Sequence, residues 1–263
     1  MQLTDRVAVV TGGASGIGAA LARRFAQEGA RRVVVVDRDL GAAQAVADEI
    51  DGVAELVDVA DPAAVNGLVD RTLAREGQID LFCSNAGIAT GVGLDDPDDM
   101  WRRAFDVNLM AHVYAARAVL PSMLARGEGW LLNTASAAGL LTSPGDAPYT
   151  VTKHGAVALA EWLSVTYGAQ GIGVSVLCPM GVATPLLMDP LAAGEPGARA
   201  VAASGEIIPP EQVADVVIAG LADERFLILP HPQVGTFWAQ KASDPDRWLA
   251  GVRRLLGPPD DTP

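Results

Sequence analysis

The opening stretch of the chain combines a short apolar strand, a glycine-rich turn and a helical pattern, in that order. Residues 7–10 (Val-Ala-Val-Val) run into Thr11-Gly-Gly-Ala-Ser-Gly-Ile-Gly18, and a helical pattern covers 19–29. Glycines at 12, 16 and 18 allow a tight turn and a close approach of the backbone. The N–H groups at the start of the helix can then face a pyrophosphate. This order of elements predicts the first unit of a nucleotide-binding α/β fold.

The alternation of apolar strands with helices continues along the chain. Further strands are predicted at 32–37, 53–59, 79–84, 129–136, 174–178 and 226–229, with helices over 40–50, 61–76, 100–126 and 211–222 and from 149 onward. Strands that are almost entirely apolar are typical of a parallel sheet covered by helices on both faces. We therefore predict an α/β fold with a doubly wound, seven-stranded parallel sheet.

One domain is expected to span 1–263, since the chain has neither internal repeats nor a low-complexity linker. Residues 1–90 would form mainly the cofactor half and 91–230 the catalytic half. Within the latter, 95–99 is an acidic segment around Pro97 that should be a solvated helix start. Residues 185–209 lack a firm period and are expected to form a mobile flap over the substrate. The tail, 231–263, is expected to be helical, and its Phe237, Trp238 and Trp248 could pack in the core or form a subunit contact.

Composition narrows the class of partner. The 263 residues are 50% hydrophobic and 19% charged, which is typical of a globular protein. The formal net charge of −13 would repel nucleic-acid backbones and anionic lipid, so we expect neither partner. The two cysteines, Cys83 and Cys178, are too few for a disulfide framework and are expected to be buried free thiols. With no secretory pattern at the start and no long apolar run, a cytoplasmic location is expected.

Polar residues and glycines collect where the predicted strands end, which is where parallel α/β sheets bind ligands. Asp37 lies 19 residues after Gly18, a position from which a carboxylate can accept hydrogen bonds from adenosine ribose hydroxyls. The same charge would repel a 2′-phosphate, so NAD is favoured over NADP, although the adjacent Arg38 could soften that preference. Asp58 could contact an adenine amine or cap a loop, and Asn85 follows the fourth strand.

Tyr149 and Lys153 are four residues apart in a predicted helix and therefore point the same way. A nearby ammonium favours the phenolate, so the pKa of Tyr149 should fall from about 10 toward working pH. Such a pair could exchange a proton with an alcohol or a ketone oxygen. Because this spacing also occurs by chance in ordinary helices, its meaning depends on a site being built around it. Ser136, at the end of the fifth strand, is placed to converge with Tyr149.

Asn108 lies inside a long predicted helix, where asparagine has a low propensity. It could be exposed, a satisfied core amide or the site of a functional kink. Pro121, 13 residues later, indicates a bend near the end of the helix. His112 is interpreted as a packing or surface residue, because a lone histidine has no evident partner.

Together these motifs resemble the short-chain dehydrogenase/reductase family nearly from end to end. The matching positions are Thr11–Gly18 for the glycine-rich turn, Asp37 for the acid of NAD-preferring members, Asn85-Ala-Gly87 after the fourth strand, and Asn108, Ser136, Tyr149 and Lys153 for the catalytic tetrad. The resemblance implies a single-domain Rossmann fold and a homo-oligomer, either a tetramer or a dimer.

The resemblance also implies a role for each site residue. Tyr149 would be the acid in ketone reduction and the base in alcohol oxidation, and Lys153 would lower its pKa and hold the nicotinamide ribose. Ser136 would bind the substrate oxygen, and Asn108 would hold a water that connects Lys153 to solvent. No metal site is implied. The expected NAD(H) contacts are Gly12, Ser15, Gly16, Ile17, Gly18, Asp37, Arg38, Asp58, Val59, Asn85, Ala86, Gly87, Tyr149, Lys153, Pro179, Gly181, Val182 and Thr184.

The chain departs from the family at Met180, where a glycine commonly follows the proline. A methionine there should make the substrate pocket narrower or more apolar. The expected lining is apolar and predicts a hydrophobic or aromatic ketone or secondary alcohol as substrate; it consists of Ala138, Leu140, Leu141, Met180, Leu186, Leu187 and Met188. Two alternatives stay open: a non-catalytic NAD(H)-binding regulator, and an epimerase, dehydratase or imine reductase on the same fold.

Overall fold

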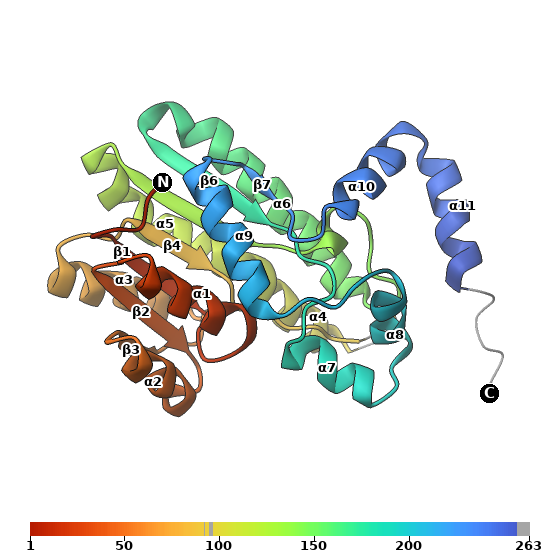
Figure 1. Cartoon of the computed structure of the whole chain (residues 1–263), viewed down its shortest axis with the longest axis horizontal. Helices are drawn as coiled ribbons and strands as arrows, with labels where there is room; N and C mark the ends of the chain where they lie inside the picture. Colours follow the sequence, from red (N-terminus) through yellow and green to blue (C-terminus); the bar gives the residue numbers. More distant parts are fainter. Residues whose placement is uncertain (92, 95–96, 257–263) are drawn as a thin grey trace.

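The computed structural model describes residues 1–91, 93–94 and 97–256 (Figure 1). Of the acidic segment predicted at 95–99, Asp95 and Asp96 lie outside these ranges, and helix α4 begins directly after Pro97. The end of the predicted tail, 257–263, also lies outside them. Within the described ranges no helix has both the length and the apolar character needed to cross a membrane.

A parallel sheet forms the centre of the molecule, and the prediction of seven strands in one doubly wound sheet is confirmed. The strand order is β3-β2-β1-β4-β5-β6-β7, so the order reverses between β1 and β4. Most strands end earlier than the apolar runs suggested, because backbone pairing stops before the apolar residues do. The strands are β1 Val7–Thr11, β2 Arg32–Asp37, β3 Val53–Leu56, β4 Leu81–Ser84, β5 Gly129–Thr134, β6 Ile172–Leu177 and β7 Leu227–Ile228.

Helices cover both faces of the sheet. Since side chains alternate across a strand, neighbouring valines of β2 enter different cores: Val34 and Val36 face one, and Val33 and Val35 the other. The first core is closed by α3 (Pro62–Glu76), α5 (Ala111–Arg126) and α6 (Ala147–Tyr167). The second is closed by α1 (Gly16–Gln27), α2 (Leu40–Glu49) and α9 (Pro210–Ala222). Cys83 and Cys178 are buried free thiols in these cores, as predicted.

The long helix predicted over 100–126 is interrupted. Its first part is α4 (Asp98–Phe105), its last part is α5, and a π-helix, η1 (Asp106–Met110), joins the two. A π turn holds one more residue than an α turn and changes the direction in which side chains point. Asn108 lies in the middle of η1, so the irregularity falls on a predicted site residue. Pro121 lies inside α5, near its end.

The segment expected to form a mobile flap, 185–209, contains two short helices although its sequence lacks a firm period. They are α7 (Pro185–Ala192) and α8 (Pro196–Ala203), and each has proline in its first turn, where the missing N–H costs nothing. The segment returns to the sheet end through a parallel bridge between Val182 and Ile208. Whether it moves stays a prediction.

The tail is helical as predicted, in two pieces: α10 (Gln233–Ser243) and α11 (Pro245–Leu256). Figure 1 shows α11 extending away from the sheet, beyond α10. The rings of Phe237 and Trp248 pack against each other with centroids 6.0 Å apart, which joins the two helices. Trp238 is 40% exposed, so the tail aromatics divide between packing and surface.

Candidate active site

The glycine turn after β1 packs directly against the segment after β4. Gly12 has φ +65°, and a Cβ on it would lie 2.9 Å from the Cα of Ala86. A Cβ on Gly18 would overlap the carbonyl oxygen of Gly12. Both glycines are therefore required by close backbone contact, and Gly12 also by its positive φ. The turn and the Asn85-Ala-Gly segment thus form one rigid floor at the reversal of strand order.

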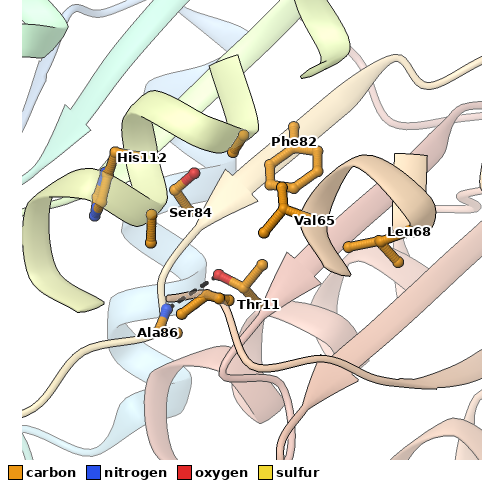
Figure 2. Close-up of a pocket in the computed structure, with 10 residues that line it drawn as sticks. Thr11, Val65, Leu68, Phe82, Ser84, Ala86 and His112 are labelled. Atoms are coloured by element: carbon orange, nitrogen blue, oxygen red, sulfur yellow. Dashed lines mark hydrogen bonds between the residues drawn. The ribbon is translucent and has the colours of Figure 1, made fainter. Parts of the chain in front are cut away.

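Asn85 connects three strands through its side chain. Its Nδ2 donates to the Thr11 carbonyl (3.0 Å), and its Oδ1 accepts from the Thr134 hydroxyl (3.2 Å). The Thr11 hydroxyl accepts from the backbone N–H groups of Asn85 (2.9 Å) and Ala86 (3.1 Å), and Figure 2 shows the second of these bonds. The amide predicted to bind cofactor therefore holds the ends of β1, β4 and β5 in register.

The start of α1 lacks a side-chain cap. Ser15, at the N-cap, is exposed, and its hydroxyl makes no capping hydrogen bond. The first N–H groups of a helix have no partner within the helix, so an uncapped N-terminus suits a phosphate. Thr184, at the start of α7, approaches this turn: a Cβ on Gly16 would lie 2.9 Å from its Cγ2. The glycine turn and the segment before α7, which are far apart in the sequence, are therefore adjacent in the predicted cofactor site. Ile17, on the first turn of α1, is half-buried.

Asp37 ends β2 beside the glycine turn. One carboxylate oxygen accepts from the Ala14 N–H (3.2 Å) and the other from the Asp39 N–H (3.1 Å). The side chain is half-buried, whereas Arg38 is exposed. The structure thus places a fixed carboxylate next to the uncapped helix end, at the position predicted for a ribose.

Asp58 caps a loop, which was one of the two readings of the sequence. Its carboxylate accepts from the Ala60 N–H (3.0 Å) and from the guanidinium of Arg103 (3.1 Å). Partial burial raises the pKa of Asp58, but these donors outweigh it, so the pKa lies below its usual value. Next to it, Val59 is buried and packs with Val107. A contact with adenine stays a prediction.

Ser136, Tyr149 and Lys153 meet where β5 ends and α6 begins. Ser136 is near enough to the Tyr149 hydroxyl to lower its pKa, and the Lys153 Nζ lies 5.5 Å from the centroid of the Tyr149 ring. Lys153 is 3% exposed and donates to the Thr134 carbonyl at 2.9 Å. An ammonium has three N–H donors, so this one bond leaves two that can serve a ligand.

Asn108 is a satisfied buried amide. Its Oδ1 accepts from the Ile88 N–H (2.8 Å), and its Nδ2 donates to the Ile88 carbonyl (2.9 Å) and the Thr152 hydroxyl (3.3 Å). Gly87 lies between the two halves of the site, since a Cβ on it would be 3.3 Å from Asn108 Oδ1 and 3.4 Å from Lys153 Nζ. The π-helix therefore aims Asn108 at the loop after β4 and at α6, and all four predicted tetrad residues gather here.

The titration behaviour of the pair corrects the sequence-based expectation. Burial, assisted by the charge of Asp146, raises the pKa of Tyr149 to about 12, although hydrogen bonding with Ser136 acts against it. Burial also lowers the pKa of Lys153 to about 8. The expected fall of the Tyr149 pKa is therefore wrong for the protein by itself, because desolvation of the phenolate outweighs the hydrogen bonding that favours it. At neutral pH Tyr149 carries its proton.

Asp146 and His231 are site residues that the sequence analysis missed. Asp146 is buried, caps α6 by accepting from the Tyr149 N–H (2.9 Å), and also binds Thr90 and Gly91. An aspartate three residues before Tyr149, with Pro148 between them, is an N-cap pattern that could have revealed it. His231 lies 2% exposed below the turn after β6. Nothing in its proline-flanked sequence indicates that position.

The predicted substrate-pocket residues do not form one surface. Ala138 and Leu140, around the 3₁₀ turn η2 (Ala137–Gly139), are buried, so they cannot line an open pocket in this structure. Leu141 and Leu187 are half-buried, and Leu186 and Met188 on α7 are 44% and 40% exposed. The half-buried Met180 packs beneath the flap, since a Cβ on Gly205 would lie 2.6 Å from its Cε.

A small internal cavity lies below the strand ends, and Figure 2 shows its lining. It is mostly apolar and is bounded by Val65, Leu68 and Phe82. Its polar members are Thr11, Ser84 and His112. His112 is buried, and its Nδ1 lies 3.0 Å from the Asn133 Oδ1. Of the two interpretations, packing or surface, the structure shows packing, and Asn133 is a partner that the sequence did not reveal.

Known proteins resemble this chain in sequence over most of its length. The model for the short chain dehydrogenase family matches residues 6–193. A 1-deoxy-11-beta-hydroxypentalenate dehydrogenase of Streptomyces avermitilis is 38% identical over 258 residues, which cover 95% of this chain and 93% of the relative. A cyclohexanol dehydrogenase of an Acinetobacter species is 34% identical over 234 residues, 86% of this chain and 92% of the relative.

A solved structure resembles the fold equally fully. The crystal structure of a short chain dehydrogenase/reductase from Burkholderia phymatum in complex with NAD superposes with a TM-score of 0.85. The two chains are 28% identical, and the match covers 100% of this chain and 99% of the other.

Proposed function

Because this chain belongs to the short-chain dehydrogenase family and is an oxidoreductase of that class, we propose that it uses NAD(H) to interconvert a secondary alcohol and a ketone. The single observation that carries the proposal is the buried Lys153 ammonium with spare donors, 5.5 Å from the ring of Tyr149, at the place where Ser136 also acts on the Tyr149 pKa. Burying a charge is costly, so such an arrangement is expected where it serves chemistry.

The residues at the strand ends fit a dinucleotide. The uncapped start of α1 would receive the pyrophosphate, and Asp37 would accept from the adenosine ribose. Lys153 would donate its free N–H groups to the nicotinamide ribose, and the turn Pro179–Thr184 would hold the nicotinamide end. Asn85 would act by keeping the floor rigid, because its side chain is already bonded to two strands. The cofactor, when bound, supplies or accepts the hydride.

The protein's own part is to move one proton at the substrate oxygen. Tyr149, protonated at neutral pH, would donate to the oxygen of the ketone as it is reduced. Ser136 would bind the same oxygen and hold it beside the phenol. Lys153, with a pKa of about 8, would remain largely charged at neutral pH and stabilise the tyrosinate that forms. Asn108 would keep α6 aligned with the loop after β4 and place a water for proton exchange.

The proposed substrate is hydrophobic. Leu186 and Met188 are exposed on α7, which begins beside the glycine turn, so an apolar molecule there would cover apolar surface. The relative named cyclohexanol dehydrogenase supports an uncharged secondary alcohol.

The test is NADH oxidation with a panel of hydrophobic ketones, comparing Tyr149→Phe with wild type. We expect kcat to fall by about 100-fold or more, because the proton donor is removed while NADH binding is kept. Tyr167→Phe is the matched control, since Tyr167 ends the same helix and packs against Trp162. Wild-type rates in Tyr149→Phe would refute the assigned acid. Tight NADH binding without turnover of any ketone would favour the non-catalytic alternative.

The preference for NAD rests on Asp37. Asp37→Ala should raise the kcat/KM with NADPH relative to that with NADH, because the repulsion of a 2′-phosphate is removed. An unchanged cofactor ratio would show that Asp37 does not face the ribose.

We further propose a cytoplasmic homo-oligomer, a tetramer or a dimer, with neither nucleic acid nor membrane as partner. Trp162 and Val165 on α6 are 57% and 86% exposed, and covering such apolar side chains favours self-association. Light scattering of the purified protein gives the mass directly, and a monomer at micromolar concentration would contradict the proposal.

A further inference from the structure

His231 follows β7 in the segment Leu229-Pro230-His231-Pro232 and lies 2% exposed. Its Nδ1 accepts from the backbone N–H of Met180 at 3.1 Å. Its Nε2 lies 3.1 Å from the carbonyl oxygen of Gly181 and 3.2 Å from that of Glu206. One imidazole therefore contacts the turn after β6 through two neighbouring residues, and the end of the flap through a third.

These contacts fix the tautomer. A nitrogen that faces an N–H group must carry the lone pair, so the ring proton lies on Nε2 and points at the two carbonyl oxygens. Both ring nitrogens are thus satisfied within the protein. A replacement side chain needs an acceptor for the Met180 N–H and a donor for the carbonyls of Gly181 and Glu206. If it lacks either, a backbone group loses this hydrogen-bond partner.

The flap returns to the sheet at the same junction. The Gly181 carbonyl accepts from the Ile208 N–H (3.0 Å), and the Ile208 carbonyl accepts from the Ala183 N–H (2.9 Å). Through the Glu206 carbonyl, His231 extends this attachment by two residues toward α8. The histidine therefore fastens the base of the flap to the turn that carries Met180.

The opposite side of the same turn touches Ser136. The Pro179 carbonyl accepts from the Ala137 N–H at 2.7 Å and from the Ser136 hydroxyl at 3.5 Å. The turn is thus held between His231 on one side and the Ser136 segment on the other. A shift of Met180 toward the space left by a shorter side chain would pull Pro179 away from Ser136.

We propose that His231 is a positioning residue that holds the turn Pro179–Gly181 and the base of the flap, and thereby sets both the place of Ser136 and the closure over the substrate. This inference rests on the proposed oxidoreductase function. Two variants separate the two sides of the ring. His231→Leu removes every hydrogen bond of the imidazole, whereas His231→Asn keeps an acceptor near the Nδ1 position for the Met180 N–H and does not reach the carbonyls of Gly181 and Glu206.

Ser175→Ala is the matched control. Ser175 lies within β6, is fully buried, donates to the Arg225 carbonyl before β7 (2.7 Å) and accepts from the Trp130 indole (3.1 Å), but contacts neither the turn Pro179–Gly181 nor the flap through these bonds. It should lower stability without changing kcat or KM. His231→Leu should lower kcat/KM by about 100-fold, the scale expected for a displacement of about 1 Å in a site. His231→Asn should recover kcat and keep a raised KM for the ketone.

A second readout does not depend on activity. Arg199 is the one lysine or arginine between residues 185 and 209, so trypsin reports on the flap by cleavage after it. Both His231 variants should be cut there faster than wild type and Ser175→Ala. Wild-type kinetics and cleavage in His231→Leu would overturn the inference, as would an equal loss of kcat/KM in Ser175→Ala. If the wild-type protein reduces no ketone, the proposed function fails, and unchanged cleavage in His231→Leu then rejects the inference separately.

Discussion

Replacing Asp146 with asparagine exchanges one carboxylate oxygen for an amino group at the start of α6. Its Oδ1 accepts from the Tyr149 N–H (2.9 Å) and the Thr90 hydroxyl (2.6 Å). Its Oδ2 accepts from the N–H groups of Thr90 (2.7 Å) and Gly91 (2.9 Å). An amide offers one acceptor oxygen, so at least one of these buried donors loses its partner.

The better orientation of the asparagine places its oxygen toward Thr90 and Gly91, and its amino group toward the Thr90 hydroxyl, which can turn and accept. The Tyr149 N–H is then left without an acceptor. One buried unpaired donor costs about 1–3 kcal/mol. For a chain of this size that corresponds to a fall in Tm of roughly 2–12 °C. The loss falls on the first turn of the helix that carries Tyr149.

The same substitution also acts on the chemistry. The Asp146 charge is one of the causes that raise the pKa of Tyr149, so its removal lowers that pKa. Alcohol oxidation requires the tyrosinate, so the alkaline rise of its kcat/KM should move to lower pH. Asp61→Asn is the control, because Asp61 caps α3 through the Ala63 N–H at an exposed site where asparagine caps equally well. The measurements are the Tm from thermal unfolding and the pH dependence of kcat/KM for alcohol oxidation, for both variants. An unchanged Tm, or an alkaline limb that stays in place or moves upward, would refute the reasoning.

Three further predictions concern stability. Burial, followed by the charge of Lys153, lowers the pKa of His112 to about 4. The unfolded chain therefore binds more protons than the folded protein between pH 4 and 6.5. The free energy of unfolding should rise with pH across that window by about 3 kcal/mol. Urea unfolding of His112→Gln should lack this slope, and an identical slope would contradict the assignment. Gly18→Ala should abolish folding or cofactor binding, because its methyl group meets the Gly12 carbonyl; a wild-type Tm with full NADH binding would contradict this. Phe25→Ala, at a fully buried site of α1, should lower the unfolding free energy by about 3–5 kcal/mol, as measured by urea denaturation.

The sequence predicted the parts of the fold that are marked by the spacing of apolar residues or by a glycine turn. Apolar strands alternating with helices fixed the parallel sheet, and the glycine turn marked the point where the strand order reverses. The flap helices were missed, because eight-residue helices rich in alanine and proline show no amphipathic period. The π-helix was also missed, since its backbone pattern depends on what Asn108 meets across the fold.

The site was predicted in its members but not in its electrostatics. The spacing of Tyr149 and Lys153 correctly placed the ammonium near the ring, but sequence carries no measure of burial, and burial dominates both pKa values. Ala138 and Leu140 were assigned to the pocket for their apolar character, and the same character buries them in the core. His231 acts through tertiary contacts with Met180 and Glu206, which no local pattern reports.

The π-helix η1 makes the length of the chain around Asn108 as important as its composition. Consecutive residues of an α-helix are rotated by about 100°, and a π turn absorbs one residue that a regular helix would not hold. Deleting a single neighbour such as Val107 would let α4 and α5 fuse into an ordinary helix. Asn108 would still be present, yet it would face away from Ile88 and Thr152, or α4 would have to rotate about the helix axis to keep it in place. The number of residues in this stretch is therefore as constrained as the identity of Asn108, so a one-residue deletion here would disable the site while leaving every tetrad side chain in the sequence.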